Sequence, residues 1–292
     1  MPLALLSILL LEVGPMVSPG AAPAIAQPPL RDGKTRRRRA PASADLPATP
    51  ALGRLAQCLR AVDSDATTAL ASARGWAGRE QGSARAEPLL CAGAALGAAS
   101  DWAGAEASFR EGFRLAAMSE PVLRARLQAM AGNAALAQGG AERALPDLAE
   151  AGAALTKAGE QRLASGVAVD RARALVVLKR VDEAASALDE ACKADPENGE
   201  AWLLSATLER RGGRLWAAQA AIEQAARLQP TDPDVGLEAG VIAMLSGHEE
   251  SARRSWNSVV ALAPASPAAT TARGYLAQLG PAGVTPNVYK KN

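Results

Sequence analysis

The sequence has few of the residues that carry enzyme chemistry. Its 292 residues include one histidine and three cysteines, and aromatic residues make up only 3%. The histidine, His248, follows Gly247 at a predicted turn, where it is an ordinary helix-start residue. No Cys-x-x-Cys pair and no pair of histidines has the spacing of a metal site. The sequence therefore predicts neither a catalytic residue nor a metal site.

Two sequence motifs of catalysis are also missing. The chain has no G-x-S-x-G turn for a nucleophilic serine, and no glycine-rich phosphate loop that ends in Lys-Ser or Lys-Thr. Its acidic residues are scattered, and many have basic neighbours, as Glu209 has in Arg210 and Arg211. Such charges are typical of a solvated helix surface. We predict a protein that is not an enzyme, with no cofactor and no small-molecule substrate.

The chain has no strong excess of either charge. It contains 32 Lys and Arg against 30 Asp and Glu, a net charge of +2. Six of the basic residues, including the run Arg36–Arg39, fall in the first 50 residues beside three acidic ones, so the rest is nearly neutral. A nucleic-acid-binding domain usually has a basic face. Nucleic acid is therefore not the expected partner.

Residues 1–26 resemble an export signal. The apolar run Met1–Leu11 is shorter than the roughly 20 residues that span a bilayer, so we predict no transmembrane segment. Small residues follow, and Ala24–Ala26 forms an A-x-A cleavage site before Gln27. Against export, no Lys or Arg precedes the run, Glu12 lies at its end, and basic residues follow soon after it. The alternatives are a disordered N-terminus and a mispredicted start codon.

The next segment, residues 27–52, is rich in Pro, Ala and Arg. Such a composition cannot form a core, so we predict a disordered linker there, and a mobile tail at 281–292. The Arg36–Arg39 run can also contact nucleic acid or an anionic membrane, which would suit a cytoplasmic adaptor. Export instead predicts a periplasmic protein of a bacterial cell envelope.

Beyond residue 52 the sequence repeats with a period of 34 residues. It is rich in Ala and Leu, and no long stretch alternates with a period of two, which indicates an all-α protein. A period of 34 is typical of a helical repeat array. The columns that keep this period are Pro196, Pro230 and Pro264; Ala184, Ala218 and Ala252; and Leu188, Ile222 and Trp256.

The unit at residues 198–230 resembles the tetratricopeptide repeat. The resemblance implies a right-handed α-solenoid of stacked antiparallel helix hairpins over residues 53–264, with a capping helix at 265–280. Small residues in the repeat let two helices approach to about 8–10 Å. Six residues of this unit match the residue types that the family prefers at those positions, which are Trp, a small residue, Ala, a bulky apolar residue, Ala and Pro. In this sequence they are Trp202, Ala206, Ala218, Ile222, Ala225 and Pro230.

The resemblance also implies a protein or peptide partner, bound in a concave groove lined by the first helices of successive repeats. The chain lacks the paired Lys and Asn that clamp a C-terminal carboxylate in some family members. An apolar segment with an acidic or amide group near Arg173 and Arg210 fits better. The alternative for the two leucines, Leu203 and Leu237, is that they only pack one helix against another. The groove residues carried over position by position are Asn133, Arg173, Leu203, Thr207, Arg210 and Leu237.

Trp216 is a further candidate for partner binding. Its equivalents in the neighbouring repeats are Asp182 and Glu250, which are residue types of solvent-exposed surface. Exposed tryptophans often anchor protein interfaces. Trp216 either contacts a partner or lies flat on the adjacent repeat. These features together predict a non-enzymatic interaction scaffold, and none of them indicates its oligomeric state.

The three cysteines, Cys58, Cys91 and Cys192, are an odd number and form no complete disulfide framework. Cys58 and Cys91 are 33 residues apart, so the repeat places them on neighbouring first helices. Helices about 8–10 Å apart rarely bring two Cα atoms within the roughly 4.4–6.8 Å that a disulfide spans. We therefore favour buried apolar packing for all three and leave open whether Cys58 and Cys91 pair.

Overall fold

The computed structural model describes residues 53–280, which form helices joined by short turns. These residues contain thirteen α-helices, one 3-10 helix and no strand, which confirms the all-α prediction. The predicted export signal, linker and tail lie outside the described residues. The helices fall into two compact units that divide between Leu163 and Ala164, and each unit is described separately.

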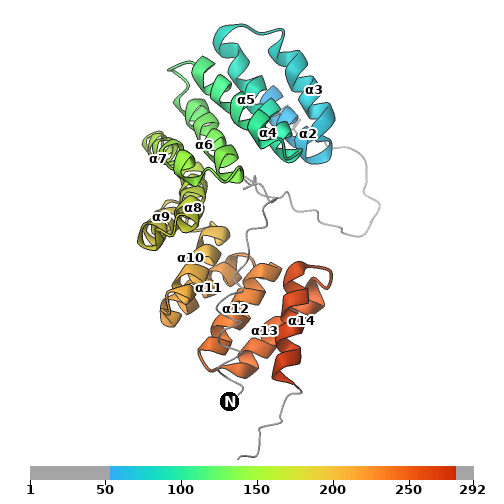
Figure 1. The fold of residues 1–292 in the computed structure, drawn as a ribbon, viewed down its shortest axis with the longest axis vertical. Helices are drawn as coiled ribbons and strands as arrows, with labels where there is room; N and C mark the ends of the chain where they lie inside the picture. The colour runs from blue at the N-terminus through green and yellow to red at the C-terminus, as the bar shows by residue number, and fades with distance from the viewer. Residues whose placement is uncertain (1–52, 281–292) are drawn as a thin grey trace, which may run out of the picture. The chain divides into compact units, whose positions relative to one another are not determined.

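The N-terminal unit consists of three helix hairpins (Figure 1). Asp65 caps α3 by accepting a hydrogen bond from the Thr68 N–H at 3.0 Å, and Asp101 caps α5 by accepting one from the Gly104 N–H at 2.9 Å. These oxygens satisfy N–H groups that a helix leaves without an internal partner. The elements are α2 (Arg54–Ser64), α3 (Ala66–Ala77), η1 (Gly82–Arg85), α4 (Ala86–Ala98), α5 (Trp102–Leu115), α6 (Pro121–Ala137) and α7 (Ala141–Lys157).

Small residues let the helices of this unit approach closely. Phe109 on α5 lies so near α4 that a Cβ at Gly93 would be 2.4 Å from its ring. Phe109 and Leu127 are both buried in the cluster that joins these hairpins. The Ser108 hydroxyl also donates a hydrogen bond to the Leu89 carbonyl at 2.8 Å, which ties α5 to α4.

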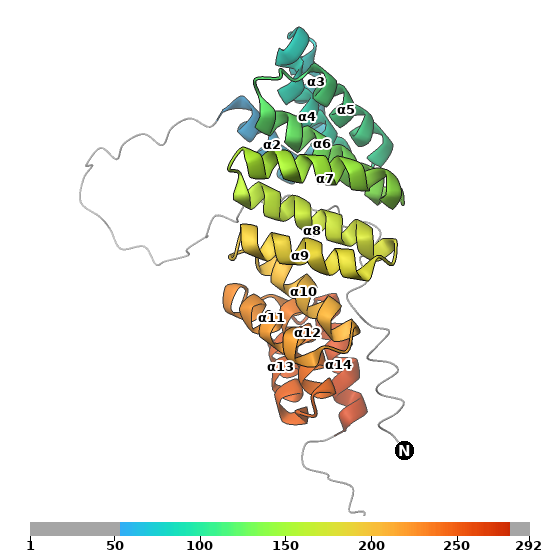
Figure 2. The same cartoon turned by 90° about the vertical axis from the view of Figure 1, so that its left-hand side faces the viewer.

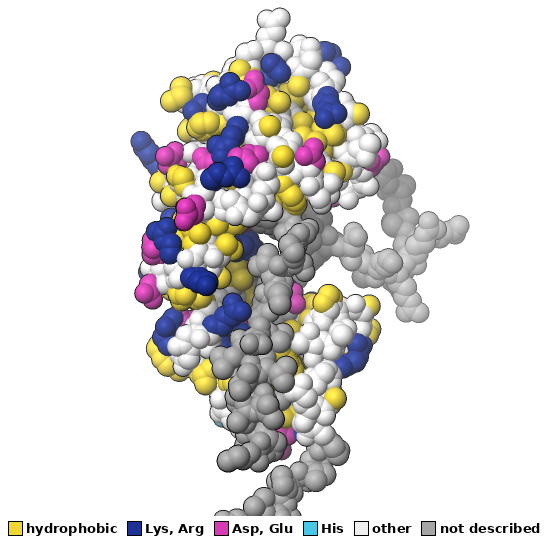
Figure 3. Space-filling model, in the orientation of Figure 1, with side chains coloured by type: hydrophobic (Ala, Val, Ile, Leu, Met, Phe, Trp, Pro, Cys, Tyr) yellow, Lys and Arg dark blue, Asp and Glu magenta, His cyan; other side chains and the backbone are white. Residues whose placement is uncertain are grey.

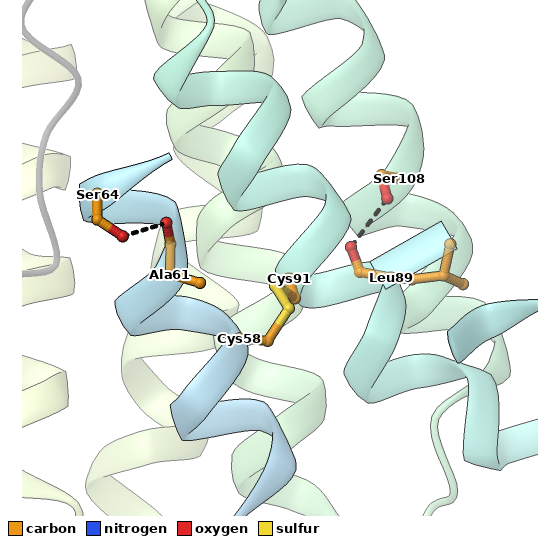
Figure 4. Close-up of a disulfide and its surroundings, with 6 residues drawn as sticks. All are labelled: Cys58, Ala61, Ser64, Leu89, Cys91 and Ser108. Carbon is orange, nitrogen blue, oxygen red and sulfur yellow. Dashed lines mark hydrogen bonds between the residues drawn. A yellow bond between two sulfur atoms is a disulfide. The ribbon is translucent and has the colours of Figure 1, made fainter. Parts of the chain in front are cut away.

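Figure 4 shows that a disulfide joins Cys58 on α2 to Cys91 on α4. Our prediction of unpaired buried cysteines is therefore wrong for this pair. The two Cα atoms are 6.2 Å apart, within the roughly 4.4–6.8 Å that a disulfide requires. The helices pack this closely because small side chains, including Ala73 and Ala92, fill the space beside the bond. The repeat spacing correctly predicted that Cys58 and Cys91 lie on neighbouring helices, but it does not determine the distance between those helices.

Cys192 on α9 (Val181–Ala194) is the free cysteine of the described residues, and it is buried as predicted. Burial, helped by the nearby charge of Asp189, raises the pKa of its thiol to about 11. Since the thiolate is the reactive form, this side chain behaves as a small apolar core residue.

The C-terminal unit continues the hairpin pattern and ends in a single helix (Figure 2). The buried Ser165 hydroxyl donates to the Ala191 carbonyl at 2.8 Å and accepts from the Asn198 side-chain amide at 2.9 Å, so it links three successive helices. Asn198, Asp232 and Ser266 each cap the helix that follows. The elements are α8 (Gln161–Val177), α9 (Val181–Ala194), α10 (Gly199–Arg211), α11 (Leu215–Leu228), α12 (Pro233–Leu245), α13 (Glu249–Leu262) and α14 (Pro267–Leu279).

The repeating sequence columns face the core of this unit. The alanine column, at 184, 218 and 252, is fully buried, as are the bulky residues of the column at 188, 222 and 256. The Trp256 ring packs so tightly that a Cβ at Gly240 would lie 2.2 Å from its indole nitrogen. Trp256 also donates a hydrogen bond to the Leu237 carbonyl at 3.2 Å. The residues that repeat every 34 positions are therefore the ones that pack in the core between the helices.

Candidate partner-binding surface

The strongest correction concerns Arg210, which we predicted to contact a partner. Its side chain is buried, with 1% of the residue exposed, and its Nε donates to the Glu238 carboxylate at 2.6 Å. Glu238 is 3% exposed. A buried charge needs a partner of opposite sign, and Glu238 supplies it from within the protein. Arg210 is therefore a structural residue and not part of a binding groove.

Tyr275 lies near the same buried ion pair. Burial raises the pKa of its hydroxyl, the Arg210 charge lowers it and the Glu238 charge raises it. Its ring also packs 5.0 Å from the Trp256 ring, centroid to centroid. The three polar residues come from α10, α12 and α14, so they connect the first helices of successive repeats. No spacing in the sequence pairs Arg210 with Glu238, which is why the pair was missed.

Asn133 and Thr207, two further predicted groove residues, are also buried, at 4% and 7% exposure. The Thr207 hydroxyl donates to the Leu203 carbonyl one turn earlier, at 3.1 Å. Side chains that are this deeply buried have almost no surface to offer a partner. The expectation that these two residues contact a partner is therefore wrong, because neither side chain is exposed.

Arg173 is partly exposed but already paired. Its guanidinium donates to Asp170 at 2.9 Å and also contacts Glu200. Asp170 is itself buried. Two carboxylates thus compensate the Arg173 charge that we expected to meet an acidic group of the ligand. Asp170 lies three residues before Arg173 on α8, a spacing that the sequence shows and that was overlooked, whereas Glu200 lies on α10 and no spacing pairs it with Arg173.

The two predicted groove leucines belong to the core. Leu203 packs partly buried against the cluster around Ile222, and Leu237 against the cluster around Trp256. The helix-packing alternative accounts for both residues. The first helices of the C-terminal unit therefore present little of the predicted binding set to solvent.

Trp216 is the predicted residue that the structure leaves open to solvent. It is 81% exposed at the start of α11, so it does not lie flat on the adjacent repeat. Two valines at the turn from α8 to α9, Val177 and Val181, are exposed at 60% and 43%. A single exposed apolar side chain is normal on a protein surface. Several that form one contiguous patch are typical of an interaction site.

The start of α11 lies within range of the charge at the start of α9. The pKa of Arg214, just before α11, is raised first by its hydrogen bond to Glu209 and further by the charge of Asp182, just inside α9. Trp216 and Val181 each lie within two residues of this charge pair. We call Val177, Val181 and Trp216 the Trp216 patch.

The arginines beside the patch are engaged within the protein. Arg214 donates to Glu209 at 2.5 and 3.1 Å, and Arg180 donates to Glu183 through two contacts of 2.6 Å. The edge of the patch therefore carries paired charges around an apolar centre, an arrangement typical of protein interfaces.

The described surface that Figure 3 draws carries no single dominant charge. On the face drawn in Figure 3, basic and acidic side chains lie side by side over both units. Within residues 53–280, His, Cys, Asp and Glu form no group that could hold a metal ion. No helix among those described has the length and apolar character needed to cross a membrane.

Comparison with known families identifies the repeat. Residues 165–208, which cover α8 to most of α10, match the family model described as tetratricopeptide repeat. The curated proteins include no match to this sequence.

Solved structures show the same fold at low sequence identity. A tetratricopeptide repeat protein from Parabacteroides merdae is 19% identical, with a TM-score of 0.53 over 67% of this chain and 73% of that one. A thermophilic TPR protein from Thermus thermophilus is 19% identical, with a TM-score of 0.50 over 66% and 98%. MamA from Desulfovibrio magneticus is 14% identical, with a TM-score of 0.50 over 62% and 97%. At such identities the likeness concerns the fold alone.

Proposed function

We propose that this chain, a tetratricopeptide repeat protein, is a non-enzymatic scaffold that binds a protein or peptide partner through the Trp216 patch. The observation that carries the proposal is the 81% exposure of Trp216; Val177 and Val181, at the turn from α8 to α9, are exposed as well. Fold alone does not define a function, so the proposal depends on this surface. It also moves the binding site from the first helices of the repeats to the turns.

The chemistry of the patch suggests the kind of partner. Its three side chains are apolar, and the arginines at its edge, Arg180 and Arg214, are paired with carboxylates. A partner gains little from bringing further charge to paired arginines at an exposed edge. We therefore expect a segment with one or two apolar anchors that cover the Trp216 ring, and an affinity that depends only weakly on salt.

Replacing Trp216 by alanine should weaken partner binding by at least about 30-fold, because interface tryptophans often contribute 2 kcal/mol or more. The partner can first be captured with a photo-crosslinking amino acid placed at Arg211, beside the patch. Isothermal titration calorimetry then compares Trp216→Ala with the unchanged chain. Thermal unfolding should barely move, since the side chain is 81% exposed.

Leu262 provides the matched control for this experiment. It is a large apolar residue, 60% exposed at the end of α13, away from the α8–α9 and α10–α11 turns. Leu262→Ala should leave the affinity unchanged. Equal affinities of Trp216→Ala and the unchanged chain would reject the patch as the binding site.

We also infer that the protein works in the periplasm of a bacterial cell envelope. The Cys58–Cys91 disulfide supports this inference, because disulfides persist in oxidising compartments. The A-x-A sequence at Ala24–Ala26 supports it independently. The cytoplasmic adaptor has no comparable support from the described residues.

Intact mass spectrometry of the protein from fractionated Gram-negative cells tests this location. We expect a periplasmic species that begins at Gln27 and has two hydrogens fewer than the reduced chain, because one disulfide forms. A cytoplasmic species that keeps Met1 and has all three thiols reduced would contradict export. The scaffold proposal would survive that result, and the search for a partner would move to the cytoplasm.

A further inference from the structure

The turn from α8 to α9 differs from the other turns that end a first helix. At the ends of α4, α6, α8, α10 and α12 one residue has a positive φ, and the next N–H donates back to a carbonyl five residues earlier. This is the Schellman arrangement, in which the residue at positive φ is usually glycine because glycine has no Cβ. The residues at positive φ in these turns are Ser100 (63°), Gly139 (80°), Lys179 (60°), Gly213 (74°) and Gly247 (82°).

Lysine is an unfavourable residue for this position. In left-handed backbone the Cβ of any other residue crowds the following carbonyl, so the conformation of Lys179 is strained where glycine would be relaxed. A basic residue is attracted to the carbonyls that end a helix, but at an exposed position this attraction is the smaller effect. The stability of the turn therefore gives no reason for lysine, and strain of this kind is often kept at functional sites.

Lys179 lies in the turn that contributes the two valines of the Trp216 patch. It comes two residues after Val177 and two residues before Val181, and all three side chains are exposed. The same short turn thus presents an ammonium group and two apolar side chains to solvent. A ligand that covers the valines comes within reach of the four-carbon stem of the lysine.

The charges around Lys179 are compensated within the protein, whereas its own charge is not. Arg180 pairs with Glu183, and the charge of Asp182 acts on Arg214. Within residues 53–280 the Lys179 ammonium group forms no ion pair and no hydrogen bond. Lys179 therefore adds an uncompensated positive charge to an apolar patch that is otherwise bordered by paired charges.

We propose that Lys179 gives the Trp216 patch its charge specificity, by binding an acidic side chain that flanks the apolar anchor of the partner protein. This inference rests on the proposed function of the patch. A partner that presents Asp or Glu beside its apolar residue gains both contacts, whereas a basic residue at that place is repelled. A single exposed charge contact also agrees with the weak salt dependence expected for the patch.

Peptide selection supplies a probe of defined sequence. A phage-displayed library of random dodecapeptides is selected on the full-length chain, and peptides that also bind Trp216→Ala are discarded. The peptides that remain bind through the patch. We expect them to carry an apolar residue with Asp or Glu next to it.

Fluorescence anisotropy with one such peptide then measures the contribution of the lysine. Lys179→Gly should weaken binding by about threefold to fivefold, the range of an exposed ion pair, and Lys179→Arg should keep most of the affinity. Lys193→Gln, which removes another exposed lysine from the last turn of α9, is the control and should bind as the unchanged chain does. Replacing the acidic residue of the peptide by its amide should cost the same factor with the unchanged chain and nothing with Lys179→Gly.

Thermal unfolding separates binding from a structural role. Lys179→Gly should raise the unfolding midpoint by at least about 2 °C, because glycine relieves the left-handed strain. A residue that serves only the fold would not combine a gain in stability with a loss of affinity. A lower midpoint for Lys179→Gly would show that the lysine is structural and would overturn the proposal.

The remaining outcomes distinguish this proposal from the proposed function. Peptides that depend on Trp216 but lack an acidic residue, or that bind Lys179→Gly with unchanged affinity, would reject the charge specificity and leave the patch as the binding site. A selection in which no peptide depends on Trp216 would reject the patch itself, and the role of Lys179 with it.

Discussion

Replacing Glu238 by alanine is expected to lower the free energy of unfolding of the C-terminal unit by about 3–5 kcal/mol, because it removes a buried carboxylate that pairs with the buried Arg210 charge. The Arg210 side chain has no exposed surface and cannot turn out to water without disrupting the packing of α10 against α12. Urea unfolding followed by circular dichroism measures the loss. The near-ultraviolet signal of Trp256, buried in the same unit, reports the same transition.

Two comparisons separate the charge effect from simple loss of packing. The double variant Arg210→Met with Glu238→Leu removes both charges and keeps most of the volume, so it should recover most of the lost stability. Glu183→Gln removes a partner of the exposed Arg180 pair and should have no measurable effect. If Glu238→Ala cost no more than Glu183→Gln, Arg210 would have another way to satisfy its charge.

Loss of the Cys58–Cys91 disulfide is expected to destabilise the first hairpin, α2 and α3, by about 3–4 kcal/mol. The bond closes a loop with a sequence separation of 33 residues and so restricts the unfolded chain. The variant with both Cys58→Ser and Cys91→Ser tests this. Hydrogen exchange should show faster exchange of the amides of α2 and α3, with little change in the C-terminal unit.

Cys192→Ser is the control for this experiment, because it removes a cysteine without removing a disulfide. In the Cys192→Ser variant, the backbone amides of α2 and α3 should show the same hydrogen-exchange rates as in the unchanged chain. A reducing agent added to the unchanged chain should reproduce the effect of the double serine variant. If neither treatment changed exchange in α2 and α3, packing of the first hairpin against α4 would be sufficient without the bond.

The local sequence was enough to predict the repeat. Helix ends follow from residues such as Asn198, Asp232 and Ser266, which cap helices with their own side chains. The prolines at 230 and 264 end helices because they have no N–H and disfavour helix in the residue before them. The small residues at 184, 218 and 252 mark the helix crossings, and the structure buries all three. These properties depend on spacing along one chain.

The candidate binding surface depended on facts that spacing does not contain. Each residue of a helix is rotated by about 100° from the next, so a small change in how two helices pack moves a side chain from solvent to core. We predicted that Arg210 and Thr207 are exposed to a partner, but both are buried. For Trp216 the sequence left open whether the side chain is exposed or packs on the adjacent repeat, and the structure exposes it.

The sequence by itself determined that this protein is an all-α array with a period of 34 residues, because helix propensity, caps and small crossing residues act locally. Only the tertiary structure decided which groups meet: Arg210 with Glu238, and Cys58 with Cys91. Such pairs form between helices far apart in the sequence, and their distances depend on how closely the helices pack. The same packing left Trp216 in solvent while it enclosed most of the polar residues expected to line a groove.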